Sequence, residues 1–256
     1  MAGVANDTID PRHYAPSPGV FAGRVIFVTG ATRGIGRAVA TALVEHGATV
    51  ILHGRDARAL DALYEELRQI GPEPAVAALD LERAQGNEYE HLTEQVTTRY
   101  GRLDGLLHNA GILGDLSPIE HYDIGVWQRV IHVNLNTAFI LTRCFIPLLR
   151  ASKDASVLFT TSGVGNRGRA YWGAYAASKF AIEGLSQVLA DELGNTPIRV
   201  NCINPGATRT RMRARAFPAE NPATLPDPST LTPAYLYLLG PDSRGVSGQR
   251  IECQPR

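Results

Sequence analysis

Short apolar stretches alternate with amphipathic stretches along this chain of 256 residues. That alternation is typical of a parallel sheet with helices on both of its faces. The apolar stretches predict strands near residues 24–29, 49–53, 75–79, 104–108, 156–161, 198–203 and 248–252. The sequence therefore predicts an α/β fold with a doubly wound, parallel, seven-stranded sheet in a single domain.

Helices are expected between these strands, and no internal repeat or low-complexity linker interrupts the pattern. The helices are expected to begin near Gly34, Ala57, Glu88, Ile124, Ala174 and, for a shorter helix, Thr230. Residues 207–229 depart from the pattern, because they are rich in Arg, Pro and Ala and have no clear periodicity. Ligands of open α/β sheets bind at the carboxyl ends of the strands. We therefore expect this segment, which follows the sixth strand, to be a loop that covers the substrate.

Composition and the N-terminal segment exclude several classes of protein. The 25 basic and 25 acidic residues cancel, so we expect no binding of DNA or RNA. The three cysteines have no CxxC spacing, which argues against a disulfide framework and a metal site. Residues 1–22 lack the regions of a secretory signal, and no window reaches the ~18 apolar residues of a membrane-spanning helix. We expect a cytoplasmic protein without membrane contact, with an N-terminal arm at 1–22 and one domain at 23–256.

Candidate chemistry is found at Tyr175 and Lys179, which stand four residues apart and so share one face of a helix. An isolated tyrosine has a pKa of about 10, but a positive charge held nearby favours the phenolate and brings proton exchange nearer to neutral pH. Tyr175 is therefore a candidate general acid and base. A Tyr and a Lys at this spacing are more often surface residues, so the pair needs support from elsewhere in the chain.

Support comes from residues 24–36, which read as an apolar strand, a glycine-rich turn and the start of a helix. Glycines let the backbone approach a pyrophosphate, and the helix that follows offers free N–H groups and the positive end of its dipole. The spacing of Gly30, Gly34 and Gly36 is TGxxxGxG, which differs from the GxGxxG of the general dinucleotide fingerprint. The match is therefore to a particular family.

With both motifs present, the chain resembles the short-chain dehydrogenase/reductase family from about Gly23 to the C-terminus, and within it the YciK-like branch of oxidoreductases. Further landmarks follow in the family's order: Asp80-Leu81, His108-Asn109-Ala110-Gly111, Asn134, Ser162 and Asn204-Pro205-Gly206. The resemblance implies a Rossmann-type fold and an enzyme that interconverts a small carbonyl compound and an alcohol by hydride transfer with a nicotinamide cofactor. It also implies a catalytic tetrad of Asn134, Ser162, Tyr175 and Lys179.

The resemblance gives each member of this tetrad a role. Ser162, thirteen residues before Tyr175, donates a hydrogen bond to the carbonyl oxygen, and Tyr175 protonates that oxygen. Lys179 lowers the pKa of Tyr175 and holds the nicotinamide ribose. The helix backbone at Asn134 orders a water that reconnects Lys179 to solvent. Asn134 is preferred to Asn136 because the family pattern is Val-Asn-Leu, and no metal is needed.

The expected cofactor is NADP(H), with NAD(H) as the alternative. NAD sites place an acid at the end of the second strand, whereas NADP sites leave that position uncharged and supply an arginine for the 2′-phosphate. Here Gly54 takes the place of the acid, Arg55 follows it, and Arg33 lies in the glycine turn. Two guanidiniums around a dianion give charge-assisted bonds. The alternative is that Arg55 is solvated and Asp56 caps the next helix, in which case the preference for NADP(H) over NAD(H) would be weak.

Further cofactor contacts are implied by the resemblance. The full expected set is Gly30, Thr32, Arg33, Gly34, Ile35, Gly36, Arg55, Asp80, Leu81, Asn109, Ala110, Gly111, Tyr175, Lys179, Pro205, Gly206, Thr208 and Thr210. Within this set Asp80 contacts the adenine, and Asn109 with the two residues after it packs against the adenine and its ribose. Thr210 lies near the nicotinamide amide.

Substrate identity and assembly are open at this level. The residues expected around the reacting carbonyl are Ile112, Leu113, Val164, Tyr171, Trp172 and Met212. Four arginines at alternate positions, 209 to 215, would attract an anion, so a reductase of a carrier-bound 3-oxoacyl group is kept as an alternative to a solvated, mobile loop. A nucleotide-binding redox sensor without turnover is a further alternative, although the tetrad is complete. The family commonly associates through helices at 124–149 and 174–193, so a homodimer or homotetramer is expected.

Overall fold

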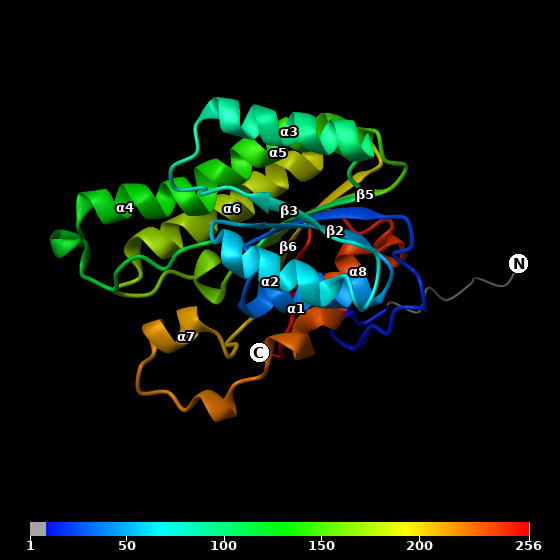
Figure 1. Ribbon diagram of the computed structural model, residues 1–256. Coiled ribbons are helices and arrows are strands. Elements are labelled where there is room, and N and C mark those ends of the chain that lie inside the picture. The colour runs from blue at the N-terminus through cyan, green and yellow to red at the C-terminus, as the bar shows by residue number, and fades with distance from the viewer. Residues whose placement is uncertain (1–8, 256) are drawn as a thin grey trace, which may run out of the picture.

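The computed structural model describes residues 9–255 and confirms the predicted α/β sheet. Seven parallel strands of this part of the chain lie in the order β3-β2-β1-β4-β5-β6-β7 (Figure 1). Their bounds are β1 Val25–Thr29, β2 Thr49–Gly54, β3 Ala75–Ala78, β4 Gly105–His108, β5 Ala155–Thr160, β6 Ile198–Asn204 and β7 Arg250–Glu252. Each bound lies within two residues of its prediction. The strands inside the sheet are buried on both faces and read as apolar runs, whereas the edge strands β3 and β7 are partly exposed.

Helices cover both faces of the sheet, as Figure 1 shows. One face carries α1 (Gly34–Glu45), α2 (Ala57–Leu67) and α8 (Thr232–Leu239). The other face carries α3 (Gly86–Tyr100), α4 (Ile124–Ile131), α5 (Thr137–Arg150) and α6 (Gly173–Glu192). Successive residues of β1 point to opposite faces of the sheet. Ile26 packs in the core under α1 and α8, whereas Phe27 contacts Phe145 of α5 with ring centroids 5.0 Å apart.

The order of the strands determines where a ligand can bind. The sheet reverses direction of winding between β1 and β4, and crevices of open α/β sheets form at such a switch point, outside the carboxyl ends of the strands. The glycine turn after β1, the residues after β4 and Ser162 after β5 all lie at this edge. The fold therefore brings the separate sequence motifs to one side of the molecule.

The N-terminal segment packs along α8. Tyr14 donates a hydrogen bond to Asp242 (2.7 Å) and lies edge-on to the ring of Tyr237, and Phe21 is completely buried in the core. Residues 1–8 of the expected arm lie outside the described residues.

The segment at 207–229 differs from the prediction of a structureless loop. It contains the helix α7 (Arg211–Ala216) and a 3-10 turn at Pro222–Thr224. The side chain of Thr210 caps α7 by accepting a hydrogen bond from the backbone N–H of Arg213 (3.2 Å). The cap and the ion pairs described below stabilise a helix of six residues, which is too short for hydrophobic periodicity to reveal.

The helix through Ile124–Arg150 is long and apolar enough, by length and a mean hydropathy of 1.2, to cross a membrane. A π-helical segment, His132–Asn136, joins α4 to α5 within it. Leu141 and Phe145 of α5 are completely buried against the sheet. A helix in the core of a protein can be as apolar as a membrane-spanning helix. Its apolar character is therefore explained by its place in the core.

A buried group of charges holds the opposite edge of the sheet. Asp154, just before β5, accepts hydrogen bonds from Arg24 (2.9 Å) and from Arg199 of β6. Arg199 also donates to the carbonyl oxygen of Gly240 (2.9 Å), which ties β6 to the end of α8. Burial by itself would raise the pKa of Asp154, but the two guanidiniums outweigh it and hold the pKa below its usual range.

We predict that Asp154→Asn destabilises the protein by about 3–5 kcal/mol, because it leaves two buried guanidiniums without their counter-charge. Urea unfolding at pH 7 measures this loss, and Asp191→Asn, an exposed change on α6, is the control. Because the folded pKa is depressed, the stabilisation is present above the ordinary aspartate pKa and is lost as pH falls through the folded value. Equal unfolding midpoints for the variant and the wild type would contradict the prediction.

Candidate active site

The turn after β1 leaves its backbone open to a close approach. Gly30 and Gly34 have φ values of +65° and +55°, a region that favours glycine. A Cβ atom at Gly36 would lie 2.5 Å from the Asn109 side-chain nitrogen and closer still to the carbonyl oxygen of Gly30. No side chain fits at Gly36 in this turn. The N-terminus of α1 consequently faces the crevice without a side chain in front of it at these positions.

Thr29 joins this turn to the end of β4, a role that the sequence analysis missed. Its hydroxyl oxygen accepts hydrogen bonds from the backbone N–H groups of Asn109 (2.9 Å) and Ala110 (3.0 Å), and it donates to Leu107 O (3.1 Å). The Asn109 side chain donates to the carbonyl oxygen of Thr29 (3.2 Å). A threonine directly before the first glycine was the available sequence signal.

The segment after β6 closes over the glycine turn. The Thr210 methyl carbon lies 3.4 Å from the place of a Cβ atom at Gly34, so Thr210 stands against the turn. Gln254 donates to the carbonyl oxygens of Pro205 (2.7 Å) and Ala207 (2.8 Å), and Thr208 is buried beside them. The C-terminal residues thus fix the chain where it leaves β6.

Two arginines are expected at the cofactor: Arg33, just before α1, and Arg55, just after β2. The exposed side chain of Arg33 makes no hydrogen bond or ion pair with any residue in the range 9–255. Arg55 lies 3.8 Å from a carboxylate oxygen of Glu82, and Arg129 of α4 approaches the other oxygen of the same group at 3.9 Å. Sequence reasoning did not find Glu82 and Arg129, because neither belongs to a motif. No carboxylate stands at Gly54, whose Cβ position faces Thr32 and Leu60.

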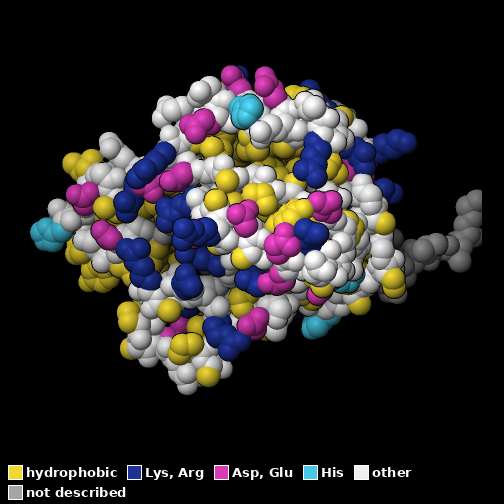
Figure 2. Space-filling model, in the orientation of Figure 1, with side chains coloured by type: hydrophobic (Ala, Val, Ile, Leu, Met, Phe, Trp, Pro, Cys, Tyr) yellow, Lys and Arg dark blue, Asp and Glu magenta, His cyan; other side chains and the backbone are white. Residues whose placement is uncertain are grey.

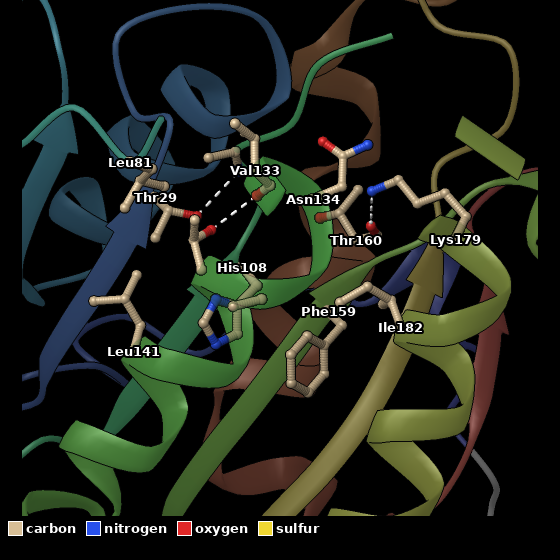
Figure 3. Close-up of a pocket in the computed structure, with 13 residues that line it drawn as sticks. Thr29, Leu81, His108, Val133, Asn134, Leu141, Phe159, Thr160, Lys179 and Ile182 are labelled. Atoms are coloured by element: carbon tan, nitrogen blue, oxygen red, sulfur yellow. Dashed lines mark hydrogen bonds between the residues drawn. The ribbon is translucent and has the colours of Figure 1, made fainter. Parts of the chain in front are cut away.

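The four residues of the expected tetrad come from three elements at the same edge of the sheet. Tyr175 and Lys179 occupy the first two turns of α6, Ser162 follows β5, and Asn134 lies in the π-helical segment. The Lys179 amine donates to the carbonyl oxygen of Thr160 (2.8 Å), as Figure 3 shows. The same amine lies 5.6 Å from the centroid of the Tyr175 ring. π-Helical segments are frequent at functional sites, and this one lies at Asn134.

The side chain of Asn134 is fully engaged. Its oxygen accepts from the backbone N–H of Ile112 (2.8 Å), and its nitrogen donates to Ile112 O (3.0 Å) and to the hydroxyl of Ser178 (3.0 Å). These bonds join the segment after β4 to α6. Figure 3 shows Asn134 and the Lys179 amine on the same side of a small cavity.

That cavity has a volume of about 10 Å³, close to the room that one water needs. Lys179, Asn134 and Thr160 line its polar end, and His108 lies at its inner end. His108 bonds to the hydroxyl of Thr142 (2.8 Å) and stacks on Phe159. Burial lowers the pKa of His108 to about 3, so this ring is neutral at physiological pH.

The acid–base properties of the pair differ from the prediction. Burial raises the pKa of Tyr175 to about 12, and the hydrogen bond with the Ser162 side chain offsets only part of that rise. Burial also lowers the pKa of Lys179 to about 8, against the opposing effects of Cys202 and Glu183. The expectation that Lys179 brings the pKa of Tyr175 toward neutrality is therefore wrong for this structure. The physical reason is that the low-dielectric surroundings disfavour both charged forms.

The arginines of the 209–215 segment are mostly paired within the protein. Arg209 binds Asp227 (2.6 Å), Arg213 makes two hydrogen bonds of 2.6 Å to Glu220, and Arg215 lies 3.3 Å from Asp115. The Arg211 side chain alone among the four has no such partner within the described part of the chain. The Arg209 and Arg215 side chains are nevertheless solvated, at 49% and 63% exposure. Figure 2 shows basic and acidic side chains interspersed on the surface of the molecule.

Aromatic rings connect this segment to the catalytic helix. Trp172 lies edge-on to Tyr175 with ring centroids 5.9 Å apart, and Phe217 lies 5.7 Å from Trp172. The Arg213 guanidinium stands 3.7 Å from the centroid of the Phe217 ring. Of the residues expected around the carbonyl, Trp172 is therefore beside Tyr175, whereas the side chain of Leu113 is buried.

Comparison with known proteins gives this site a family. The sequence matches the short chain dehydrogenase family over residues 24–221, which is more than half of the chain, and the protein belongs to this family. It is 48% identical over 244 residues to the uncharacterized oxidoreductase YciK of Escherichia coli K12, a match that covers 95% of this chain and 96% of YciK.

Solved structures of related proteins support the same family. A short chain dehydrogenase from Pseudomonas syringae is 52% identical, with a TM-score of 0.92, and covers 94% of this chain and 98% of its own. A short chain dehydrogenase from Escherichia coli CFT073, complexed with NADPH, is 48% identical with a TM-score of 0.91, and covers 94% of this chain and all of its own. The recognition of the YciK-like short-chain dehydrogenases from sequence is confirmed, and the chain is an oxidoreductase of that family.

Proposed function

We propose that the protein interconverts a carbonyl compound and an alcohol by NADP(H)-dependent hydride transfer, with Tyr175 as the general acid and base. One observation carries the proposal: a buried tyrosine bonded to Ser162 stands one helical turn from a buried lysine, beside a glycine turn that no side chain fills. A phenol, a hydroxyl and an ammonium at one crevice form the donor set that protonates a reduced carbonyl oxygen.

The residues at the crevice fit a phosphorylated dinucleotide. Gly36 and its turn leave the free N–H groups of α1 accessible, as binding a pyrophosphate requires. Gly54 offers no carboxylate to repel a 2′-phosphate, and Arg33 and Arg55 supply two guanidiniums near it. The NADPH complex of a relative that is 48% identical supports the same choice. We assign the expected cofactor contacts from Gly30 to Thr210 on this basis, with NAD(H) as the less favoured nucleotide.

In the reductive direction the bound nicotinamide supplies a hydride to the carbonyl carbon. Ser162 donates a hydrogen bond to the carbonyl oxygen, and Tyr175 gives that oxygen its proton. A pKa of about 12 keeps the Tyr175 phenol protonated at neutral pH, which suits proton donation. The Lys179 amine, which donates a hydrogen bond to Thr160 O, then places a positive charge near the phenolate that forms.

The proton lost by Tyr175 must be replaced from solvent. Because the Asn134 side chain is occupied by Ile112 and Ser178, only its backbone is left to hold a water in the small cavity beside Lys179. A water there would connect the Lys179 amine to the rest of a proton path. A pKa of about 8 allows Lys179 to exchange a proton near physiological pH.

Two alternative functions lose support. The arginines at 209, 213 and 215 are paired with Asp227, Glu220 and Asp115, which partly offsets the positive charge that would attract an anionic acyl carrier. A nucleotide-binding redox sensor would have no use for the complete tetrad, whose members meet at one edge. A cytoplasmic location stays a prediction.

We predict that Tyr175→Phe retains the fold and the affinity for NADPH but lowers kcat by at least about 10²–10⁴, the usual contribution of general acid catalysis. A screen of carbonyl compounds that follows NADPH oxidation identifies the substrate for this measurement. Tyr64→Phe, at a half-buried tyrosine of α2 away from the site, is the control for loss of a phenol. Undiminished turnover by Tyr175→Phe would mean that another group delivers the proton.

We predict that Gly54→Asp combined with Arg55→Gln shifts preference from NADPH toward NADH, because it adds a carboxylate that repels the 2′-phosphate and removes a cation. A Cβ atom at position 54 lies 3.2 Å from a Thr32 methyl carbon, so Gly54→Ala is the control for crowding. Titration of nucleotide fluorescence measures both affinities without turnover. Equal affinity of the wild type for NADH and NADPH would contradict the assignment.

We propose in addition that the protein assembles through α5 and α6. Both helices expose large apolar side chains on the monomer: Phe139 is 50% exposed, Phe180 44% and Val188 54%. Light scattering should give at least twice the 27.6 kDa of one chain, and Val188→Asp should shift it toward the monomer. Ile70→Asp, which changes an apolar residue of similar exposure away from these helices, should not. A wild type of 27.6 kDa in dilute solution would contradict the assembly.

A further inference from the structure

A buried carboxylate lies directly behind the turn that carries Ser162. Glu183 belongs to α6, one helical turn beyond Lys179, and only 11% of its side chain is exposed. The same oxygen of Glu183 accepts two hydrogen bonds, one from the Thr161 hydroxyl (2.6 Å) and one from the Nε of Arg250 (2.8 Å). Glu183 is therefore linked both to the residue before Ser162 and to β7, the last strand of the sheet.

Arg250 extends this network to Ser162 itself. Its guanidinium donates to the carbonyl oxygen of Ser162 (3.2 Å) and is paired with Glu252. Glu252 in turn accepts from the side chain of Asn204 (2.6 Å), at the end of β6. One guanidinium thus ties α6, β7 and the turn after β5 together, through residues that lie far apart in the sequence.

The turn after Ser162 packs closely against this network. A Cβ atom at Gly165 would lie 2.5 Å from both the Glu183 oxygen and the Thr161 hydroxyl. The turn at Gly163–Gly165 therefore folds directly over the buried charges. The backbone at Ser162 is held on one side by Thr161 and Glu183, and on the other by Arg250.

The Ser162 hydroxyl, by contrast, is weakly held by its own surroundings. Within the described part of the chain, the Ser162 hydroxyl is bonded to Tyr175 and accepts one further, long hydrogen bond from the Val164 N–H (3.5 Å). The position of this hydroxyl consequently depends on where the backbone places it. Buried ion pairs stabilise a fold little in comparison with apolar residues of the same volume. The bonded oxygen of Glu183 reaches both the residue before Ser162 and the guanidinium that binds the Ser162 carbonyl oxygen, so the group is placed to fix the geometry of Ser162.

We infer that Glu183 and Arg250 are positioning residues, which hold the Ser162 turn so that its hydroxyl meets Tyr175 and the substrate carbonyl. This inference rests on the proposed function, because it gives Ser162 a part in the reaction. Misplacement of a reacting group by about 1 Å can cost on the order of 100-fold in rate. Loss of either residue should therefore lower kcat, and loss of Arg250, which leaves the charge of Glu183 near Lys179 in place, should not change the nucleotide site.

Glu183→Gln is the first test, because it keeps the shape and one acceptor oxygen while it removes the charge that holds Arg250. We expect kcat to fall about 10- to 100-fold. The Kd for NADPH, measured by fluorescence, should be unchanged in the Arg250 variants, which keep the charge of Glu183 near Lys179. Arg250→Lys keeps the positive charge without the branched guanidinium and should lose part of the activity, whereas Arg250→Gln should lose more. Glu192→Gln, an exposed change on the same helix, is the matched control.

The decisive measurement is a double-mutant cycle with Ser162→Ala. If Glu183 acts through the Ser162 hydroxyl, Glu183→Gln adds no further loss of kcat once that hydroxyl is gone. Multiplicative losses in the double variant would overturn the inference, and so would an unchanged kcat in Glu183→Gln. Should Glu183→Gln fail to fold, Thr161→Val, which removes only the hydroxyl bonded to Glu183, takes its place in the cycle.

Failure of this inference can be told apart from failure of the proposed function. Full activity of both Ser162→Ala and Tyr175→Phe would reject the proposed mechanism and the inference with it. A large loss in those two variants, with none in Glu183→Gln and Arg250→Gln, would reject only the positioning roles.

Discussion

The hydrogen bonds at Thr29 are the interaction on which the site most depends. They join the end of β1 to the end of β4, at the point where the sheet reverses its winding and a crevice opens. Because the glycine turn begins at the next residue, a shift of Thr29 would move the N-terminus of α1 relative to Asn109. The same link positions residues 110–112, and Ile112 in turn binds Asn134. A single hydroxyl thus couples the two halves of the crevice.

Burial then determines how the chemical groups in that crevice behave. Tyr175 and Lys179 are both enclosed, and removal from water shifts their pKa values in opposite directions, each away from its charged form. A phenol with a pKa of about 12 and an amine with a pKa of about 8 suit the donation and relay of a proton that the proposed function assigns to them. Their spacing along α6 alone suggested the reverse for Tyr175. The difference arises because neighbouring charge is a local property of the sequence, whereas burial is a property of the fold.

Much of the fold could be predicted because the inner strands of the sheet are buried on both faces. Such strands appear in the sequence as apolar runs, and the glycine turn indicates the first crossover. The helix α7 was missed because its six residues are too few to show hydrophobic periodicity, and a cap and an ion pair stabilise it. Other contacts could not be predicted because the partners are far apart along the chain, as are Glu183 and Arg250, which are separated by sixty-seven residues. Motifs identify groups that meet a ligand, but the groups that hold those motifs in place carry no comparable signature.

The paired arginines and the aromatic contact at Phe217 bear on how substrates are chosen. Arg213 is bonded to Glu220 and packs on Phe217, which contacts Trp172 beside Tyr175. The segment is therefore connected to α6 through side chains that also border Tyr175. Under the proposed mechanism, a substrate beside Tyr175 would meet Trp172, which also contacts Phe217. A compound that displaced Phe217 would disturb the partly buried pair of Arg213 and Glu220, whereas a compound that fitted against Trp172 would leave that pair intact. The proposed function thus links the choice of substrate to the packing of the segment at 207–229 as well as to the charge of its arginines.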